Sequence, residues 1–129
     1  MNFKTSSITG KPFPTLDSQW SKPLPFTKEN ISMLPDSTGV YIFLNQKETP
    51  IYVGRTINGD YSGLKHRVQS YAEKDDFSVH PTKKILRPHI HSFIYRKTTE
   101  EGAKKIEDKL KQFTIYNADN EYNEAKKKE

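Results

Sequence analysis

The sequence contains no cysteine, so disulfide bonds, thiolate metal ligands and thiol nucleophiles are excluded as the basis of its fold or function. It also contains no apolar run approaching the roughly 20 residues that a helix needs to cross a bilayer. The opening residues, MNFKTSSITGKPFP, lack the apolar stretch that is typical of a secretory signal peptide. From these absences we expect a cytoplasmic protein that does not span a membrane.

Hydrophobic residues are also scarce, at 33% of the 129 residues, whereas aromatic residues reach 12%. A chain of this length fits one domain with one core, and the low apolar content favours a compact domain with polar extensions. The net charge is +5. A modest basic excess suits a partner rich in phosphate, although charge alone is a weak guide because many proteins carry as much.

The first 35 residues differ in composition from the rest, because prolines interrupt any regular pattern and Ser, Thr and Lys fill the gaps. The apolar residues of this segment are Phe3, Phe13, Leu16, Trp20, Leu24 and Phe26. We interpret residues 1–35 as an N-terminal arm that docks its aromatic side chains on the core or is partly disordered; an arm that grips substrate or a second copy is the alternative. Thr27 is expected to cap a short helix that runs to Met33. Residues 36–120 then form the domain, and residues 121–129 form a polar, basic tail.

Two short runs rich in β-branched and aromatic residues, GVYIFL at 39–44 and PIYVG at 50–54, predict a β-hairpin. Because side chains alternate along a strand, each strand divides its residues between two faces. One predicted face comprises Val40, Ile42, Leu44, Ile51 and Val53, and the other comprises Tyr41, Phe43, Tyr52 and Gly54. In this register both tyrosines lie on one side of the hairpin, and the glycine beside them leaves space for a substrate to approach.

Apolar residues at helical spacing predict two further helices. The first covers residues 64–73, and the second follows Thr99, whose side chain is a favoured N-cap. Between these helices, residues 75–88 are polar, basic and broken by two prolines, so no regular element is predicted there. Residues 89–98, HIHSFIYRKT, predict a third strand.

Four short motifs occur in order along these elements. They are Gly39-Val40-Tyr41 with Tyr52-Val53-Gly54 on the hairpin, Leu64-Lys65-His66-Arg67 with Tyr71 on the next helix, Glu107 on the last helix, and Asn117 beyond it. Each motif is weak alone, but their order on the expected elements is specific. Together they resemble the motifs of the GIY-YIG endonucleases, over residues 39–117. The resemblance implies an α/β fold in which helices flank a small, mainly antiparallel sheet of three strands.

The resemblance further implies that Arg67, Glu107 and Asn117 belong to an active site for phosphodiester hydrolysis, and the chemistry of these residues agrees. The guanidinium of Arg67 is always charged and matches the geometry of phosphate oxygens, so it can stabilise the charge that builds in the transition state. The Glu107 carboxylate is an oxygen ligand suited to Mg²⁺ or Mn²⁺. One protein carboxylate is plausible because Mg²⁺ keeps most of its waters. Asn117 is expected to organise the site.

Tyr41 and Tyr52 are expected to position the attacking water, with one of them acting as general base. The pKa of a free tyrosine is about 10, so this role needs a lowered pKa or a partner that accepts the proton. The residues alone do not decide which tyrosine serves. Further substrate contacts are expected from Arg55, His66, Tyr71, Lys83 and Lys84. Arg55 stands where the family often has lysine, so we expect it to contact phosphate rather than to activate the nucleophile.

Each of these residues also has an ordinary structural explanation. Tyrosines are common in half-buried strands, and an arginine can cover an apolar stripe with its stem. Glu107 can pair with Lys104 or Lys111, each one helical turn away. Asn117 can simply end a helix. Taken singly the residues favour these explanations, whereas the complete set favours the functional one.

We therefore predict a divalent-metal-dependent endonuclease that cuts nucleic acid, with DNA as the expected substrate. Two other functions stay open at this point: a non-catalytic nucleic-acid-binding module on the same fold, and a protein-interaction domain. Members of the family it resembles commonly carry separate DNA-binding domains. Because this chain has no room for one, target recognition is expected from its loops, its arm, a homodimer partner or a separate targeting subunit.

Overall fold

The computed structural model describes residues 13–56, 63–72 and 81–114. They form one antiparallel sheet with the strand order β1-β4-β2-β3. The strands are β1 (Leu24–Pro25), β2 (Gly39–Leu44), β3 (Pro50–Arg55) and β4 (Ser92–Lys97). The helices are α1 (Lys28–Ser32), α2 (Leu64–Ala72), α3 (Pro81–Leu86) and α4 (Glu100–Leu110), with 3-10 turns η1 (Arg87–His89) and η2 (Lys111–Phe113). The predicted α/β fold, an antiparallel sheet flanked by helices, is confirmed.

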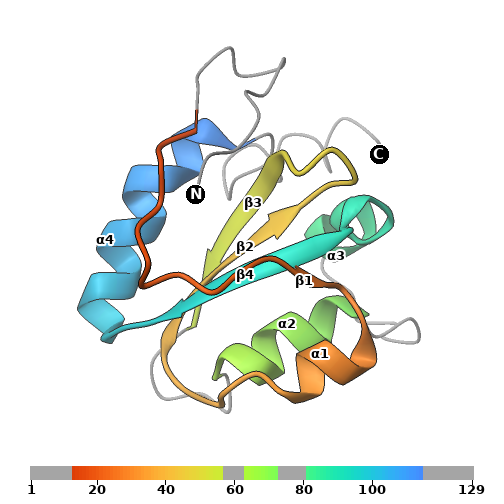
Figure 1. Cartoon of the computed structure of the whole chain (residues 1–129), viewed down its shortest axis with the longest axis horizontal. Coiled ribbons are helices and arrows are strands. Elements are labelled where there is room, and N and C mark those ends of the chain that lie inside the picture. The colour runs from red at the N-terminus through yellow and green to blue at the C-terminus, as the bar shows by residue number, and fades with distance from the viewer. Residues whose placement is uncertain (1–12, 57–62, 73–80, 115–129) are drawn as a thin grey trace.

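Helices cover both faces of the sheet, with α4 on one side and α1 and α2 together on the other (Figure 1). On the α4 face the buried residues are Val40, Ile42, Leu44, Val53, Ile94, Ala103 and Leu110. On the opposite face they are Ile31, Leu34, Tyr41, Phe43, Ile51, Leu64, Val68, Tyr71, Leu86 and Phe93. Because both faces are covered, every residue of β2 is buried. Among the described helices, none combines the length and the apolar character that a membrane span requires.

The sheet has four strands rather than the predicted three, because the N-terminal segment contributes β1. Leu24 pairs with Phe93 of β4, and Pro25 pairs with Ser92. Before β1, the segment runs along α4 and then crosses to the edge of β4 (Figure 1). Its buried side chains in the α4-face cluster are Phe13, Leu16 and Trp20. A strand of two residues has no alternation that a sequence pattern can reveal, and its proline is tolerated because β1 lies at the edge of the sheet.

The predicted helix caps are confirmed at both positions. The Thr27 hydroxyl accepts a hydrogen bond from the backbone N–H of Asn30 at 3.2 Å. The Thr99 hydroxyl accepts one from the backbone N–H of Gly102 at 3.1 Å. Met33, to which this helix was predicted to run, lies one residue beyond the end of α1 and is 79% exposed.

The segment before β4 is more regular than the sequence predicts. α3 begins at Pro81, where a proline suits the first helical turn because the N–H it lacks would be unpaired there. This proline therefore starts a helix instead of interrupting the chain. η1 follows directly, so His89 lies in a 3-10 turn and β4 begins only at Ser92. The predicted strand over 89–98 was wrong at both ends, since β4 covers 92–97.

The hairpin contains an irregularity that changes one predicted face. Phe43 pairs with Tyr52, whereas Leu44 pairs with Pro50, so Ile51 has no opposite residue on β2. An extra residue of this kind is a β-bulge, and it disrupts the alternation of side chains. Ile51 consequently packs in the cluster on the α2 face, which corrects its predicted place on the α4 face.

Candidate active site

The predicted site lies where the open end of the hairpin meets α2 and α4. Tyr41 of β2 pairs with Gly54 of β3. One residue beyond β3, the buried Thr56 closes the hairpin through two contacts with Gly39. The backbone N–H of Gly39 donates to the Thr56 hydroxyl at 3.1 Å, and the backbone N–H of Thr56 donates to the Gly39 carbonyl at 3.1 Å. These bonds hold the ends of the two motif-bearing strands together.

Three phenols share one aromatic cluster on the α2 face. The ring centroids lie 6.4 Å apart for Tyr41 and Tyr52, 6.2 Å for Tyr41 and Tyr71, and 6.1 Å for Tyr52 and Tyr71. The prediction that both hairpin tyrosines point to the same side is confirmed. Tyr71 also makes a side-chain hydrogen bond with Tyr41, a contact that the sequence analysis missed. The available signal was spacing, because Tyr71 follows Arg67 by one helical turn.

Gly54 leaves no space for a substrate, which corrects the prediction made from the sequence. A Cβ atom at this position would lie 2.3 Å from both Cζ and Oη of Tyr41. The phenol of Tyr41 therefore fills the space above Gly54. Glycine at this position is what allows the tyrosine ring to lie against β3.

Gly54→Ala is expected to destabilise the fold by about 2 kcal/mol, since overpacking a rigid, buried contact typically costs 1–3 kcal/mol. The measurement is urea unfolding followed by circular dichroism. Gly102→Ala is the matched control: its Cβ would come within 2.5 Å only of the Thr98 hydroxyl, a side chain that can turn, and alanine favours a helix. Equal stability of Gly54→Ala and the parent chain would contradict the packing described here.

The Tyr41 phenol is held in its neutral form. Burial raises the pKa of Tyr41 well above its ordinary value of 10.0, and Tyr71 raises it further, while the positive charge of Arg67 lowers it and the negative charge of Glu107 raises it. Two conclusions follow. Tyr41 is poorly suited to accept a proton at neutral pH, and both Arg67 and Glu107 lie near enough to the same phenol to influence its pKa.

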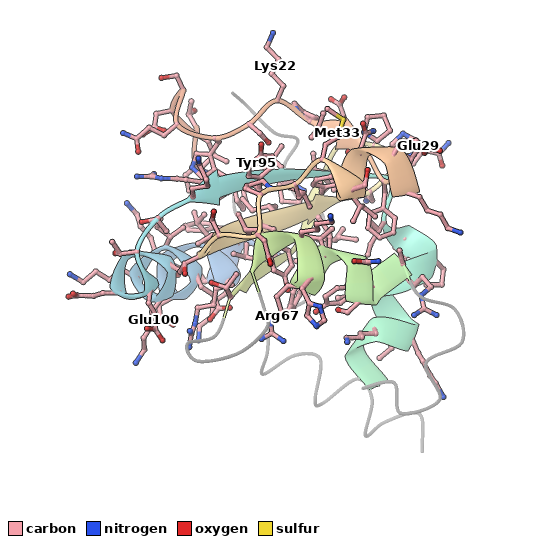
Figure 2. The ribbon with its side chains drawn as sticks, turned by 90° about the horizontal axis from the view of Figure 1, so that it is seen from below. Lys22, Glu29, Met33, Arg67, Tyr95 and Glu100 are labelled. Atoms are coloured by element: carbon pink, nitrogen blue, oxygen red, sulfur yellow. The ribbon has the colours of Figure 1, made fainter. Side chains whose placement is uncertain are left out.

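Arg67 carries an unusual unpaired donor. Its side chain projects from α2 and is half-buried (Figure 2). Among the described residues, its Nε is buried and has no hydrogen-bond partner. A buried donor without a partner is costly, more so when it belongs to a charged group. An anionic oxygen placed beside this guanidinium would satisfy it.

Glu107 pairs across the site with Arg55 at the end of β3. The Nε of Arg55 donates to Oε1 of Glu107 at 3.3 Å, and the two side chains are 26% and 24% exposed. Burial raises the pKa of Glu107 above its ordinary value of 4.5, and Arg55 opposes this shift. From the sequence, the predicted partners of Glu107 were Lys104 and Lys111, and Arg55 was not among them. No local spacing reveals a pair whose members are 52 residues apart.

The donor set around Glu107 fits a solvated divalent cation. Across residues 13–56, 63–72 and 81–114, no three His, Asp or Glu side chains gather in one place, so these residues offer no closed cage of protein ligands. Mg²⁺ is commonly held by one or two carboxylates, with waters and substrate oxygens completing the shell. A single, partly exposed carboxylate at the end of the hairpin suits that mode of binding.

Of the other predicted substrate contacts, Lys83 lies near the phenol cluster, whereas His66 and Lys84 are exposed on the surface. The Nζ of Lys83 is 5.6 Å from the centroid of the Tyr71 ring. Arg87, which the prediction omitted from the site, donates from Nε to the Tyr71 carbonyl at 2.7 Å. Asn117 lies outside the described residues.

A hollow of about 440 Å³ lies elsewhere, lined by Gln19, Ser21, Tyr95, Arg96 and Lys97. Figure 2 shows Tyr95 at the β4 ribbon and Arg67 on the other side of α2. The hollow contains none of the predicted site residues.

Comparison with known proteins gives concordant results. A family model described as the UvrC-like GIY-YIG domain matches residues 37–123. UvrABC system protein C of Alkaliphilus metalliredigens is 36% identical over 74 residues, and that of Alkaliphilus oremlandii is 39% identical over 75 residues. Each alignment covers 57% of this chain and 11% of the relative. The chain therefore spans about a tenth of the length of these relatives.

A solved structure shows the same fold. It is the GIY-YIG N-terminal endonuclease domain of UvrC from Thermotoga maritima, bound to its catalytic divalent cation, magnesium. The two structures align with a TM-score of 0.50 and 24% sequence identity. The alignment covers 64% of this chain and 83% of that domain.

Proposed function

This chain belongs to the UvrC-like GIY-YIG family, and from that premise we propose that it is a divalent-metal-dependent endonuclease that hydrolyses phosphodiester bonds in DNA. The observations that support this most are the buried Nε of Arg67, which has no hydrogen-bond partner among the described residues, and the partly exposed Glu107 carboxylate, which pairs with Arg55 at the end of β3. A module that only binds phosphate has no need of a carboxylate beside an arginine. A hydrolase needs both charges, one for the phosphate and one for a cation.

In the proposed reaction, Arg67 binds the scissile phosphate. Its planar guanidinium can donate two parallel hydrogen bonds to phosphate oxygens. The buried, unpaired Nε then gains an acceptor, and the positive charge stabilises the charge that spreads over the phosphoryl oxygens in the transition state. Because the group is held partly out of water, this stabilisation is stronger than it would be in solvent.

Glu107 holds the cation, Mg²⁺ or Mn²⁺. A bound divalent cation supplies charge stabilisation on the phosphoryl oxygens and helps the leaving oxygen to depart. Asn117 is proposed to organise the site. Lys83 and Lys84, with His66, Tyr71 and Arg55, are proposed to contact neighbouring phosphates. In support of that path for the nucleic acid, none of the residues of α2, α3 and η1 is acidic.

Tyr52 is the better candidate for general base. Its side chain is half-buried, whereas Tyr41 is fully covered and held neutral. Tyr41 is therefore proposed to be a positioning residue, which fixes Tyr71 through their hydrogen bond and fills the space above Gly54. Once its own phenol proton has passed to solvent, the Tyr52 phenolate can accept the proton of a water molecule at the surface of the cluster as the attack proceeds.

Tyr52→Phe is expected to slow DNA cleavage by about a hundredfold, because general-base catalysis is typically worth two to four powers of ten. Tyr41→Phe is expected to slow it by about tenfold, since only positioning is lost. Single-turnover cleavage rates, measured across a pH series, compare the two. In addition, the rise of the rate with pH should be lost only in Tyr52→Phe. A larger loss in Tyr41→Phe would reverse the assignment.

The proposed activity is tested by incubating supercoiled and branched DNA with the chain and Mg²⁺ or Mn²⁺. Nicking that requires the cation and is lost in both Arg67→Ala and Glu107→Ala supports the endonuclease. Binding without cleavage, unaffected by Glu107→Ala, would identify a nucleic-acid-binding module instead. Neither binding nor cleavage would leave a protein-interaction domain.

Target choice is proposed to need surfaces beyond the described site. The relatives that the chain matches are UvrABC system proteins C, and it corresponds to about a tenth of their length. A homodimer partner or a separate targeting subunit is proposed to supply contacts with the target. Size-exclusion chromatography with light scattering, with and without duplex DNA, separates these possibilities.

A further inference from the structure

Arg55 pairs with the Glu107 carboxylate, which is the group proposed to bind the divalent cation. Its Nε donates to Glu107 Oε1 at 3.3 Å, and its Nη1 donates to the backbone carbonyl of Thr56 at 3.4 Å. Both distances are longer than the roughly 2.7–3.2 Å that is usual for N–H···O hydrogen bonds. The side chain is also 26% exposed. The guanidinium is therefore weakly attached and has solvent beside it.

The Arg55 guanidinium and the proposed divalent cation compete for the Glu107 carboxylate. Arg55 neutralises Glu107 in the cation-free chain, since a half-buried carboxylate needs a counter-charge. A divalent cation at Oε1 would meet the guanidinium at a distance where like charges repel strongly in a partly buried site. For the cation to bind, Arg55 must leave the carboxylate or tolerate that repulsion.

A released Arg55 has an obvious new partner in DNA. Its guanidinium fork matches phosphate oxygens, and within the described residues its Nη2 makes no hydrogen bond. If the Arg55 guanidinium moved from Glu107 to a DNA phosphate, it would still be paired with a negative charge. Conversely, a DNA phosphate that draws Arg55 away from Glu107 would free the carboxylate for the cation.

We propose that Arg55 is a built-in competitor of the divalent cation at Glu107, and that its transfer from Glu107 to a DNA phosphate makes cation and DNA bind cooperatively. The inference rests on the proposed function, because it needs a cation at Glu107 and a phosphate nearby. Coupling between two ligands is reciprocal, so each ligand must strengthen the binding of the other by the same factor.

The first test measures Mn²⁺ binding to the DNA-free chain, by the electron paramagnetic resonance signal of free Mn²⁺. Arg55→Gln is expected to bind Mn²⁺ about tenfold more tightly than the parent chain, a factor within the range typical of coupled sites. Arg55→Lys should move the affinity in the same direction by less, because lysine keeps the positive charge but loses the planar guanidinium. Lys111→Gln is the matched control: it removes a neighbouring positive charge that pairs with Asp108 at 3.6 Å, and it should change the affinity much less.

The second test measures binding of a phosphorothioate duplex, which resists cleavage, with and without Mn²⁺. In the parent chain Mn²⁺ should strengthen duplex binding, and in Arg55→Gln most of that gain should disappear. Unchanged or weaker Mn²⁺ binding by Arg55→Gln, together with loss of binding by Glu107→Gln, would overturn this inference alone. Mn²⁺ binding that Glu107→Gln leaves unaltered would overturn the proposed cation site as well.

Discussion

Glu107→Gln is expected to slow DNA cleavage by about a thousandfold, equivalent to roughly 4 kcal/mol of lost transition-state stabilisation. Glutamine has nearly the same shape as glutamate, and its amide oxygen can still accept the hydrogen bond from Arg55. It carries no charge with which to hold a divalent cation. The measurement is the single-turnover rate of nicking supercoiled DNA at saturating Mg²⁺, for the parent chain and the variant.

Asp108→Asn is the control for this loss, because it removes a carboxylate from the adjacent position of α4 where the side chain is exposed. Its cleavage rate should match that of the parent chain. A Glu107→Gln variant that cuts at the parent rate would show that Glu107 does not hold the cation. It would also remove the main argument for hydrolysis.

The same variant should change how stability depends on pH. Burial raises the pKa of Glu107 above its ordinary value of 4.5, so the folded chain binds this proton more tightly than the unfolded chain does. This group therefore favours the folded state at low pH, and that contribution is lost as the pH rises from 4.5 through the raised pKa. In urea unfolding over this range, the stability of the parent chain relative to Glu107→Gln should decline as the pH rises.

Arg67→Met is expected to slow cleavage by two to three powers of ten and yet leave the fold as stable or slightly more stable. The loss of rate follows because a positioned donor to the transition state is typically worth 10²–10³ in rate. The fold should not lose stability, because the variant removes a buried Nε that has no partner among the described residues. Replacing an unpaired donor with an apolar group is favourable. Single-turnover kinetics and thermal unfolding measure the two effects separately.

Arg67→Lys should recover little of the activity, since an ammonium keeps the charge but loses the planar fork. Lys65→Met, on the same helix, controls for the loss of one positive charge and should mainly weaken DNA binding in a salt-dependent way. If Arg67→Met instead lowered stability by several kcal/mol and spared the rate, Arg67 would be a structural residue whose stem supports α2.

Local patterns were sufficient for most elements of this fold. The alternating runs of β2 and β3, the helical stripes of α2 and α4, and the caps at Thr27 and Thr99 were all predicted within one or two residues. Each depends on a period or on hydrogen bonds between residues close in the chain. The ordered motifs added the family and the residues Tyr41, Arg67 and Glu107.

Other features lay beyond such patterns because they depend on which surfaces meet. β1 is only two residues long and forms because Leu24 pairs with Phe93 of β4. The bulge at Ile51 follows from the register between two strands, and the Tyr41 ring fills the space above Gly54 only once those strands pair. The bond between Arg55 and Glu107 forms only when α4 folds against the end of β3.

The amino-acid order therefore established the main elements and the family and indicated the groups proposed for catalysis, since periodicity and capping act over a few residues. Folding decided how those groups are paired: which phenol is buried and neutral, which arginine Nε has no partner among the described residues, and which arginine pairs with the Glu107 carboxylate. These properties are set by desolvation and by contacts between distant segments. No window of neighbouring residues contains that information.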